Sequence, residues 1–61
     1  MKRKQLIKHL KTNGCEFERE GGNHSWWFNR SLNKHSTVPR HNEIDDNLAR
    51  KICKDLGISL P

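Results

Sequence analysis

Hydrophobic side chains recur at helical spacing near both ends of the chain. Leu6, Ile7 and Leu10 stand among lysines, and this pattern predicts a short amphipathic helix over residues 3–12. A longer apolar stripe near the end of the chain stops at Gly57, a residue type that commonly terminates helices, and predicts a second helix. The side chains of that stripe are Ile44, Leu48, Ala49, Ile52, Cys53 and Leu56.

Polar residues mark both ends of the second predicted helix. Asn42, followed three residues later by Asp45, resembles a capping arrangement at its start. Acidic side chains near the start and basic side chains near the end both complement the helix dipole. They are Glu43, Asp45 and Asp46 near the start, and Arg50, Lys51 and Lys54 toward the end.

The segment between the two helices carries the signals of three short strands. Residues 15–20 begin by alternating apolar and polar side chains and are followed by two glycines, which indicates a half-buried strand that ends in a tight turn. Residues 24–30 are rich in aromatic side chains, which favour strands, and turn-forming residues follow them. Residues 35–39 are expected to return as a third strand. Because proline cannot donate a hydrogen bond to a sheet, this strand should end at Pro39 or lie at the sheet edge.

These elements predict a single α+β domain over residues 1–61 with the order α-β-β-β-α. Consecutive strands joined by short turns favour an antiparallel sheet, and two amphipathic helices need one apolar surface to cover. We therefore expect both helices on the same face of a three-stranded sheet. A chain of 61 residues forms only one small domain, so its stability should be marginal.

Two adjacent tryptophans must point to opposite faces of the sheet, because side chains alternate along a strand. Trp26 shares its face with Phe28, and we assign that pair to the core. Trp27 is then expected on the open face, where it could stack on a nucleic-acid base or contact a partner protein.

Positive charge is concentrated at the beginning of the chain. The formal net charge is +5 and the pI is near 9.7. Residues 1–14 hold five basic side chains and no acid, whereas residues 43–61 hold four acids and three bases. A basic patch attracts polyanions, and nucleic acid is the usual partner, with an anionic membrane or an acidic protein as the alternatives.

Several classes of protein have no support in the sequence. No apolar segment approaches the roughly 20 residues of a membrane span, and no apolar core of signal-peptide type follows the basic start, so we expect a cytoplasmic protein with no membrane partner. The histidines and cysteines lack the close spacings of metal sites, and no nucleotide-binding or serine-hydrolase motif is present. We therefore expect no metal and no cofactor. Cys15 and Cys53 fit buried positions as free thiols, with a disulfide or a redox role as the alternative.

One histidine stands where a catalytic group could act. A glycine pair and Asn23 precede His24, so its backbone is anchored at a strand start while its ring can face a ligand. Histidine titrates near neutral pH and can transfer protons in RNA cleavage, in which the ribose 2′-OH attacks the neighbouring phosphorus without a metal or cofactor. The residues alone leave open a second interpretation, in which this is a turn histidine with no catalytic role.

Three segments of the chain form a pattern that covers nearly its whole length. An opening helix runs into Asn13-Gly14 and a strand, and Gly22-Asn23-His24 then begins the next strand. Val38-Pro39-Arg40-His41 precedes a helix that ends in Ile52-Cys53-Lys54-Asp55-Leu56-Gly57-Ile58. In this order and spacing, the three segments resemble the HicA toxin family of toxin-antitoxin systems.

The resemblance implies a fold like that of double-stranded-RNA-binding domains. It also implies a toxin that cleaves mRNA and inhibits translation, and a HicB-like antitoxin protein that neutralises it. It makes His24 the catalytic candidate, with Gly22 and Asn23 as the turn that supports it. The usual form of that turn is Gly-Ser-His, so Asn23 places an amide where a hydroxyl is common.

Four basic residues are the candidates for contact with the RNA substrate, because guanidinium and ammonium groups offset phosphate charge. Pro39 and His41 are interpreted as structural. The alternatives are a non-catalytic RNA-binding module of the same fold, and a domain whose aromatic and basic surface serves only a protein partner. The basic candidates are Lys4, Lys8, Lys11 and Arg40.

Overall fold

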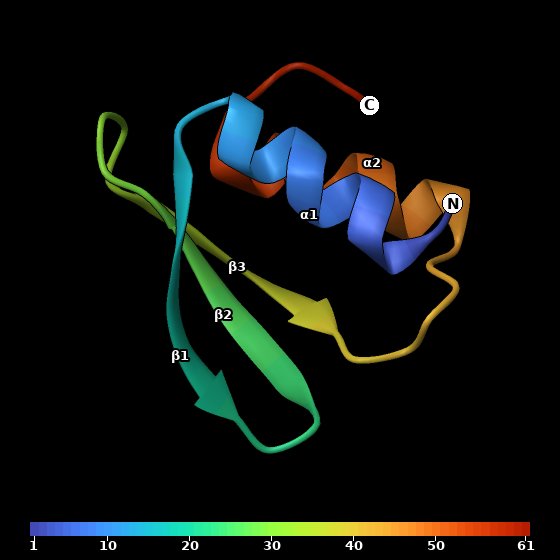
Figure 1. Ribbon diagram of the computed structural model, residues 1–61. Coiled ribbons are helices and arrows are strands. Elements are labelled where there is room, and N and C mark those ends of the chain that lie inside the picture. The colour runs from blue at the N-terminus through green and yellow to red at the C-terminus, as the bar shows by residue number, and fades with distance from the viewer.

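Two helices and three strands follow one another in the predicted order α-β-β-β-α. The computed structural model describes all 61 residues (Figure 1). The first helix and the three strands start and end within one residue of the bounds that the sequence predicts, and the second helix ends before Gly57 as predicted but starts later than its predicted cap at Asn42. The elements are α1 (Arg3–Thr12), β1 (Cys15–Gly21), β2 (His24–Asn29), β3 (Lys34–Pro39) and α2 (Asp46–Leu56).

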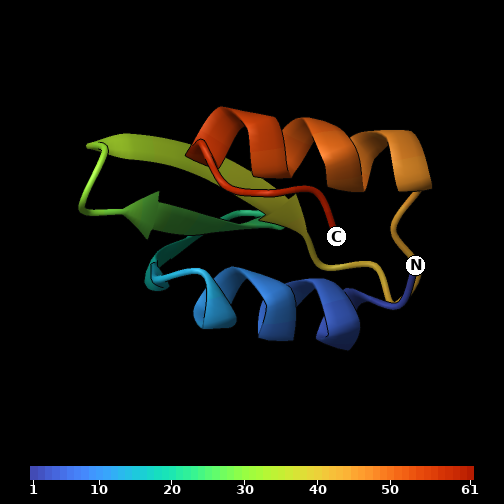
Figure 2. The ribbon, with the colours of Figure 1, turned by 90° about the horizontal axis from the view of Figure 1, so that it is seen from above.

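The three strands form one antiparallel sheet in the order β1-β2-β3, with a register shift in β1 between Phe17 and Arg19. Both helices lie on the same face of this sheet, α1 against β1 and α2 against β3 (Figures 1 and 2). The other face, which we call the open face, is not covered by any element. The predicted α+β architecture, with two helices on one face, is therefore confirmed.

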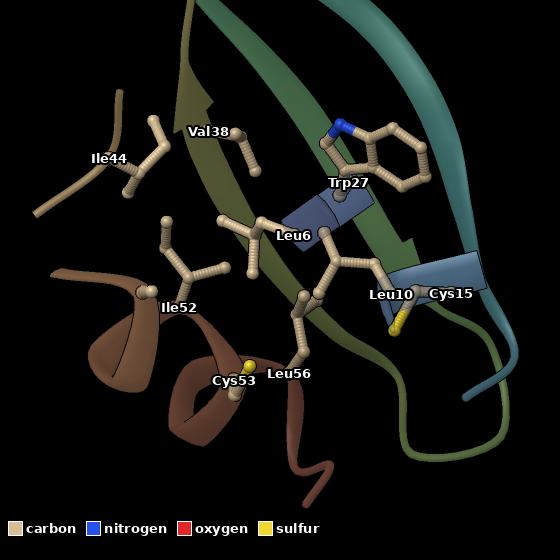
Figure 3. Close-up of a cluster of buried hydrophobic side chains, with 10 residues drawn as sticks. Leu6, Leu10, Cys15, Trp27, Val38, Ile44, Ile52, Cys53 and Leu56 are labelled. Carbon is tan, nitrogen blue, oxygen red and sulfur yellow. The ribbon is translucent and has the colours of Figure 1, made fainter. Parts of the chain in front are cut away.

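Ten buried apolar residues form one core between the helices and the sheet (Figure 3). Cys15 and Cys53 are part of it, and both are free cysteines, as the sequence predicts. Burial raises the pKa of both thiols, which favours their protonated form. The other eight members of the core are Leu6, Leu10, Trp27, Val38, Ile44, Ala49, Ile52 and Leu56.

The assignment of the two tryptophans to the faces of the sheet is wrong. Trp27 lies in the core with 4% of its surface exposed, whereas Trp26 and Phe28 are half-buried on the open face. The inward face of β2 therefore carries Ser25, Trp27 and Asn29. Two polar residues can point inward because each finds a partner there, and a buried polar group costs little free energy once it is hydrogen-bonded.

The predicted cap of the second helix is also wrong. The N-cap is Asp45, whose carboxylate accepts hydrogen bonds from the backbone N–H groups of Asn47 (3.0 Å) and Leu48 (3.3 Å). Asn42 lies upstream of the helix, where its backbone carbonyl accepts a hydrogen bond from the Arg3 N–H at 2.8 Å. This contact holds the loop between β3 and α2 against the first turn of α1, so the chain is not free to begin a helix there.

Candidate active site at the start of the second strand

A two-residue loop, Gly22-Asn23, joins β1 to β2 and places His24 directly opposite Gly21. Gly22 has a φ of +65°, whereas Asn23 does not have a positive φ. This sign pattern matches a type II′ hairpin turn, which favours glycine at the first loop position. On the far side of the loop, the Arg40 N–H donates to the Asn23 carbonyl at 3.3 Å and ties the end of β3 to the turn.

His24 is the first residue of the central strand, and its backbone is fixed by neighbours on both sides. Gly21 of β1 and Pro39 of β3 lie opposite it. Because side chains alternate along a strand and Ser25 points inward, the His24 ring lies on the open face. The residue is exposed, and no side-chain hydrogen bond or ion pair within the chain engages its ring. The imidazole is therefore held at a rigid backbone position and is accessible to a ligand.

An aromatic row continues from His24 along the open face of β2. The Trp26 ring lies over Gly21, where an added Cβ would come within 2.8 Å of the indole nitrogen. The Arg19 guanidinium carbon lies 5.0 Å from the centre of the Trp26 ring, a cation-π contact. Phe28 follows, with the His35 ring at a centroid distance of 4.6 Å. A surface that accepts flat aromatic groups therefore lies next to the histidine, and it is built by Trp26 and Phe28 rather than by Trp27.

A polar network lies behind the start of β2, on the face that the helices cover. The buried Ser25 hydroxyl donates to the carboxylate of Glu20, at 3.0 and 3.2 Å from its two oxygens. It also accepts a hydrogen bond from Nη2 of Arg3 at 3.0 Å. Arg3 donates through Nε to the Pro39 carbonyl at 2.8 Å, and Arg40 forms an ion pair with Glu20. The network thus connects α1, β1, β2 and the end of β3.

The charges of this network act on the Glu20 carboxyl. Removal from water opposes its ionisation, but the hydrogen bonds from Arg40 and Ser25 and the positive charges of Arg40 and Arg3 outweigh that effect. Together they hold the pKa of Glu20 below its usual value. Glu20 is therefore a carboxylate at neutral pH that is bound by the Arg40 guanidinium and the Ser25 hydroxyl, with the positive charge of Arg3 nearby. Sequence reasoning missed Arg3, Glu20 and Ser25 as members of this site.

The predicted RNA-contacting residues are only partly brought together. Lys4, Lys8 and Lys11 are all exposed and share one outward side of α1, as their spacing requires. Lys4 lines a hollow with Arg3 and Asn42 at the end of the sheet near His24. Lys8 and Lys11 extend along α1 away from that end, and α1 covers the face of the sheet opposite to the His24 ring.

The other three histidines lie away from this site or make different contacts. A ring nitrogen of His9 lies 2.8 Å from the Ser59 carbonyl oxygen, and His35 pairs with Glu18 at 2.9 Å. His41 is exposed in the loop after β3. No group of three or more His, Cys, Asp or Glu side chains gathers where it could hold a metal ion.

The fold and the site define a class, a small basic α-β-β-β-α domain that presents an accessible histidine at a glycine turn. A family model described as the HicA toxin of bacterial toxin-antitoxin systems matches residues 3–58, nearly the whole chain. The chain therefore belongs to the HicA toxin family, which confirms the resemblance. Comparison with curated proteins and with solved structures found no match. None of its helices has the length and apolar character needed to cross a bilayer.

Proposed function

We propose that this protein is a metal-independent endoribonuclease toxin that cleaves mRNA and inhibits translation, with His24 as its catalytic residue. The single observation that carries the proposal is the exposed, unpaired imidazole at the glycine turn of a chain that belongs to the HicA toxin family. Because the proposed substrate is mRNA, we expect the toxin to act in the cytoplasm.

The chemistry requires only proton transfer at a fixed position. The ribose 2′-OH loses a proton as it attacks the adjacent phosphorus, and the 5′ oxygen of the next nucleotide gains one as it leaves. An imidazole that titrates near neutral pH can serve one of these transfers, which contributes about 10² to 10⁴ in rate. The pairing of His24 with Gly21 and Pro39 supports this role, because a rigid backbone keeps the ring where the substrate must come.

The open face supplies a path for single-stranded RNA. Bases can stack on Trp26 and Phe28, which follow His24 on the same face of the strand, as aromatic residues on other sheets stack on RNA bases. In this proposal Trp26 takes the base-stacking role that the sequence suggested for Trp27, because Trp27 is buried. Phosphates next to the cleaved bond lie near Arg40 and Lys4, and those farther along near Lys8 and Lys11.

A HicB-like antitoxin is the proposed protein partner. The family is one of toxin-antitoxin pairs, and a nuclease toxin must be covered while it is held inactive. The open face offers Trp26 and Phe28 as aromatic anchors beside His24, and aromatic residues are frequent binding hot spots. A partner with an acidic surface would also bind faster to a chain with a net charge of +5.

A non-catalytic RNA-binding module is the second candidate, since the aromatic row and the basic residues would serve binding alone equally well. Incubation of the purified protein with single-stranded RNA in excess chelator separates the candidates. Cleavage that persists in chelator supports the proposed enzyme. Retention of intact RNA indicates the binding module, and neither cleavage nor retention indicates a domain that serves only a protein partner.

A further inference from the structure

A groove runs from the first turn of α1 to the end of the sheet behind His24. One open hollow of about 480 Å³ is lined by Arg3, Glu20, Ser25, Arg40 and Asn42. A second hollow of about 400 Å³ is lined by Lys2, Arg3, Lys4 and Asn42. The two hollows share Arg3 and Asn42 and therefore adjoin one another, and we call them together the basic groove. Four cationic side chains and one carboxylate, that of Glu20, line it, and one of the four cations, Lys2, is paired with Glu43 at 3.1 Å.

The groove is held in place by contacts that do not depend on a ligand. Arg3 is anchored to the Pro39 carbonyl and to the Ser25 hydroxyl, and its own N–H is bonded to Asn42 across the floor of the groove. Ser25 is 1% exposed, so its hydroxyl is a buried polar group fixed at the wall. Donors that are already ordered lose less entropy when a ligand arrives, which favours binding.

Glu20 occupies this groove as an internal anion. Its carboxylate receives the Ser25 hydroxyl and the Arg40 guanidinium, and the positive charge of Arg3 helps to keep its pKa low. Guanidinium groups bind carboxylate and phosphate through the same planar donor geometry. A phosphate group could therefore take the donors that now hold Glu20.

We propose that the basic groove binds a phosphodiester of single-stranded RNA next to the cleavage site, and that this phosphate displaces Glu20 from Arg40. The inference rests on the proposed function in taking RNA as the ligand. The position follows from the Arg40 N–H, which is bonded to the Asn23 carbonyl in the turn before His24. An RNA backbone that passes His24 and rounds the end of the sheet therefore enters the groove at Arg40. Glu20 then acts as a built-in competitor that weakens RNA binding.

The test measures binding of a single-stranded oligonucleotide of 2′-deoxyribose by fluorescence anisotropy. Such a probe lacks the 2′-OH and cannot be cleaved by the proposed chemistry. Glu20→Gln should bind it about two- to fivefold more tightly than the parent, the gain that follows from releasing an exposed ion pair. Asp55→Asn is the matched control, because Asp55 also accepts from a lysine (Lys51, 2.8 Å) and a serine (Ser36, 3.5 Å) but lies outside the groove. Both variants raise the net charge by one.

The proposal is overturned if Glu20→Gln binds the oligonucleotide no more tightly than Asp55→Asn while thermal melts show both folded. A second variant gives an independent check. Arg40→Gln should lower the slope of log affinity against log salt by about 0.7, the value for one neutralised phosphate of a single strand, and should cancel the gain from Glu20→Gln in the double variant. An unchanged slope would also overturn it.

The outcome is separable from that of the proposed ribonuclease activity. Because the deoxy probe reports binding alone, tighter binding by Glu20→Gln would stand even if the protein cleaved no RNA. Conversely, RNA cleavage in chelator with no effect of Glu20→Gln would support the nuclease and refute the groove. If Glu20→Gln tightened the complex with the antitoxin but not with the oligonucleotide, the groove would be a protein-binding site and the phosphate proposal would be wrong.

Discussion

Replacing each of the adjacent tryptophans by alanine should have very different effects on stability. Trp27 is 4% exposed in the core, and truncation of a buried tryptophan typically costs about 3–5 kcal/mol. Its indole N–H has no hydrogen-bond acceptor within the chain, and removal of this unpaired donor returns about 1–3 kcal/mol, so the net cost should be about 2 kcal/mol. Trp26 is half-buried on the open face, where its ring packs over Gly21 and makes the Arg19 cation-π contact, worth about 0.5–1 kcal/mol.

These magnitudes are large compared with the stability of so small a domain. For 61 residues, the free energy of unfolding is expected to be about 3–9 kcal/mol. At about 4–8 °C per kcal/mol, Trp27→Ala should lower the melting temperature by roughly 8–16 °C and Trp26→Ala by less than about 8 °C. Far-ultraviolet circular dichroism on heating measures the melting temperature of both variants without relying on tryptophan emission. If Trp26→Ala destabilises the protein as much as Trp27→Ala, the assignment of Trp27 to the core and Trp26 to the open face is wrong.

Three further predictions concern charge and partners. Changing Lys4, Lys8 and Lys11 to Gln should reduce the slope of log RNA affinity against log salt by about 0.7 for each phosphate that these lysines neutralise. Filter binding at several salt concentrations measures this slope. An unchanged slope would place the RNA surface elsewhere. The antitoxin should raise the melting temperature and protect residues 22–29 from hydrogen exchange; protection confined to α2 would rule out direct occlusion of the site. The depressed pKa of Glu20 means that its ionised form stabilises the fold above its usual pKa of 4.5, and that this contribution disappears as the pH falls through the lower folded-state value. The difference in melting temperature between the parent and Glu20→Gln should therefore be present at neutral pH and shrink on acidification, and a difference independent of pH would contradict the network.

The order of the elements could be predicted because each helix and strand carries its own periodicity. Which face of β2 points into the core could not be predicted, because aromatic side chains lie on both faces: Trp26 and Phe28 on one, Trp27 on the other. The deciding contacts are long-range. The Asn29 amide donates to the Leu56 carbonyl at 2.7 Å, and the Ser25 hydroxyl meets side chains from α1 and β1, so both polar residues are satisfied on the inner face. No local pattern in β2 contains that information.

The candidate site was predictable to a similar degree. A glycine turn followed by a histidine at a strand start is a local feature, so His24 and its turn could be read from the sequence. The polar network could not, because Arg3, Glu20, Ser25 and Arg40 come from four separate parts of the chain. The one available signal was Ser25. Its parity along the strand is that of Trp27, so an inward assignment of Trp27 would also have placed the Ser25 hydroxyl on the inner face. The capping prediction at Asn42 failed for the same reason, since its carbonyl is bonded to the distant Arg3.

The most direct test of the central claim compares RNA cleavage by the parent, His24→Ala and His41→Ala in excess chelator. Both histidines are exposed, so neither substitution should cost much stability, and thermal melts should show all three proteins folded. His24→Ala is predicted to lower the cleavage rate by about 10² to 10⁴ and to abolish growth inhibition, whereas His41→Ala should have the milder effect. Cleavage by folded His24→Ala at a rate near that of the parent would contradict the assignment of His24 as the catalytic residue.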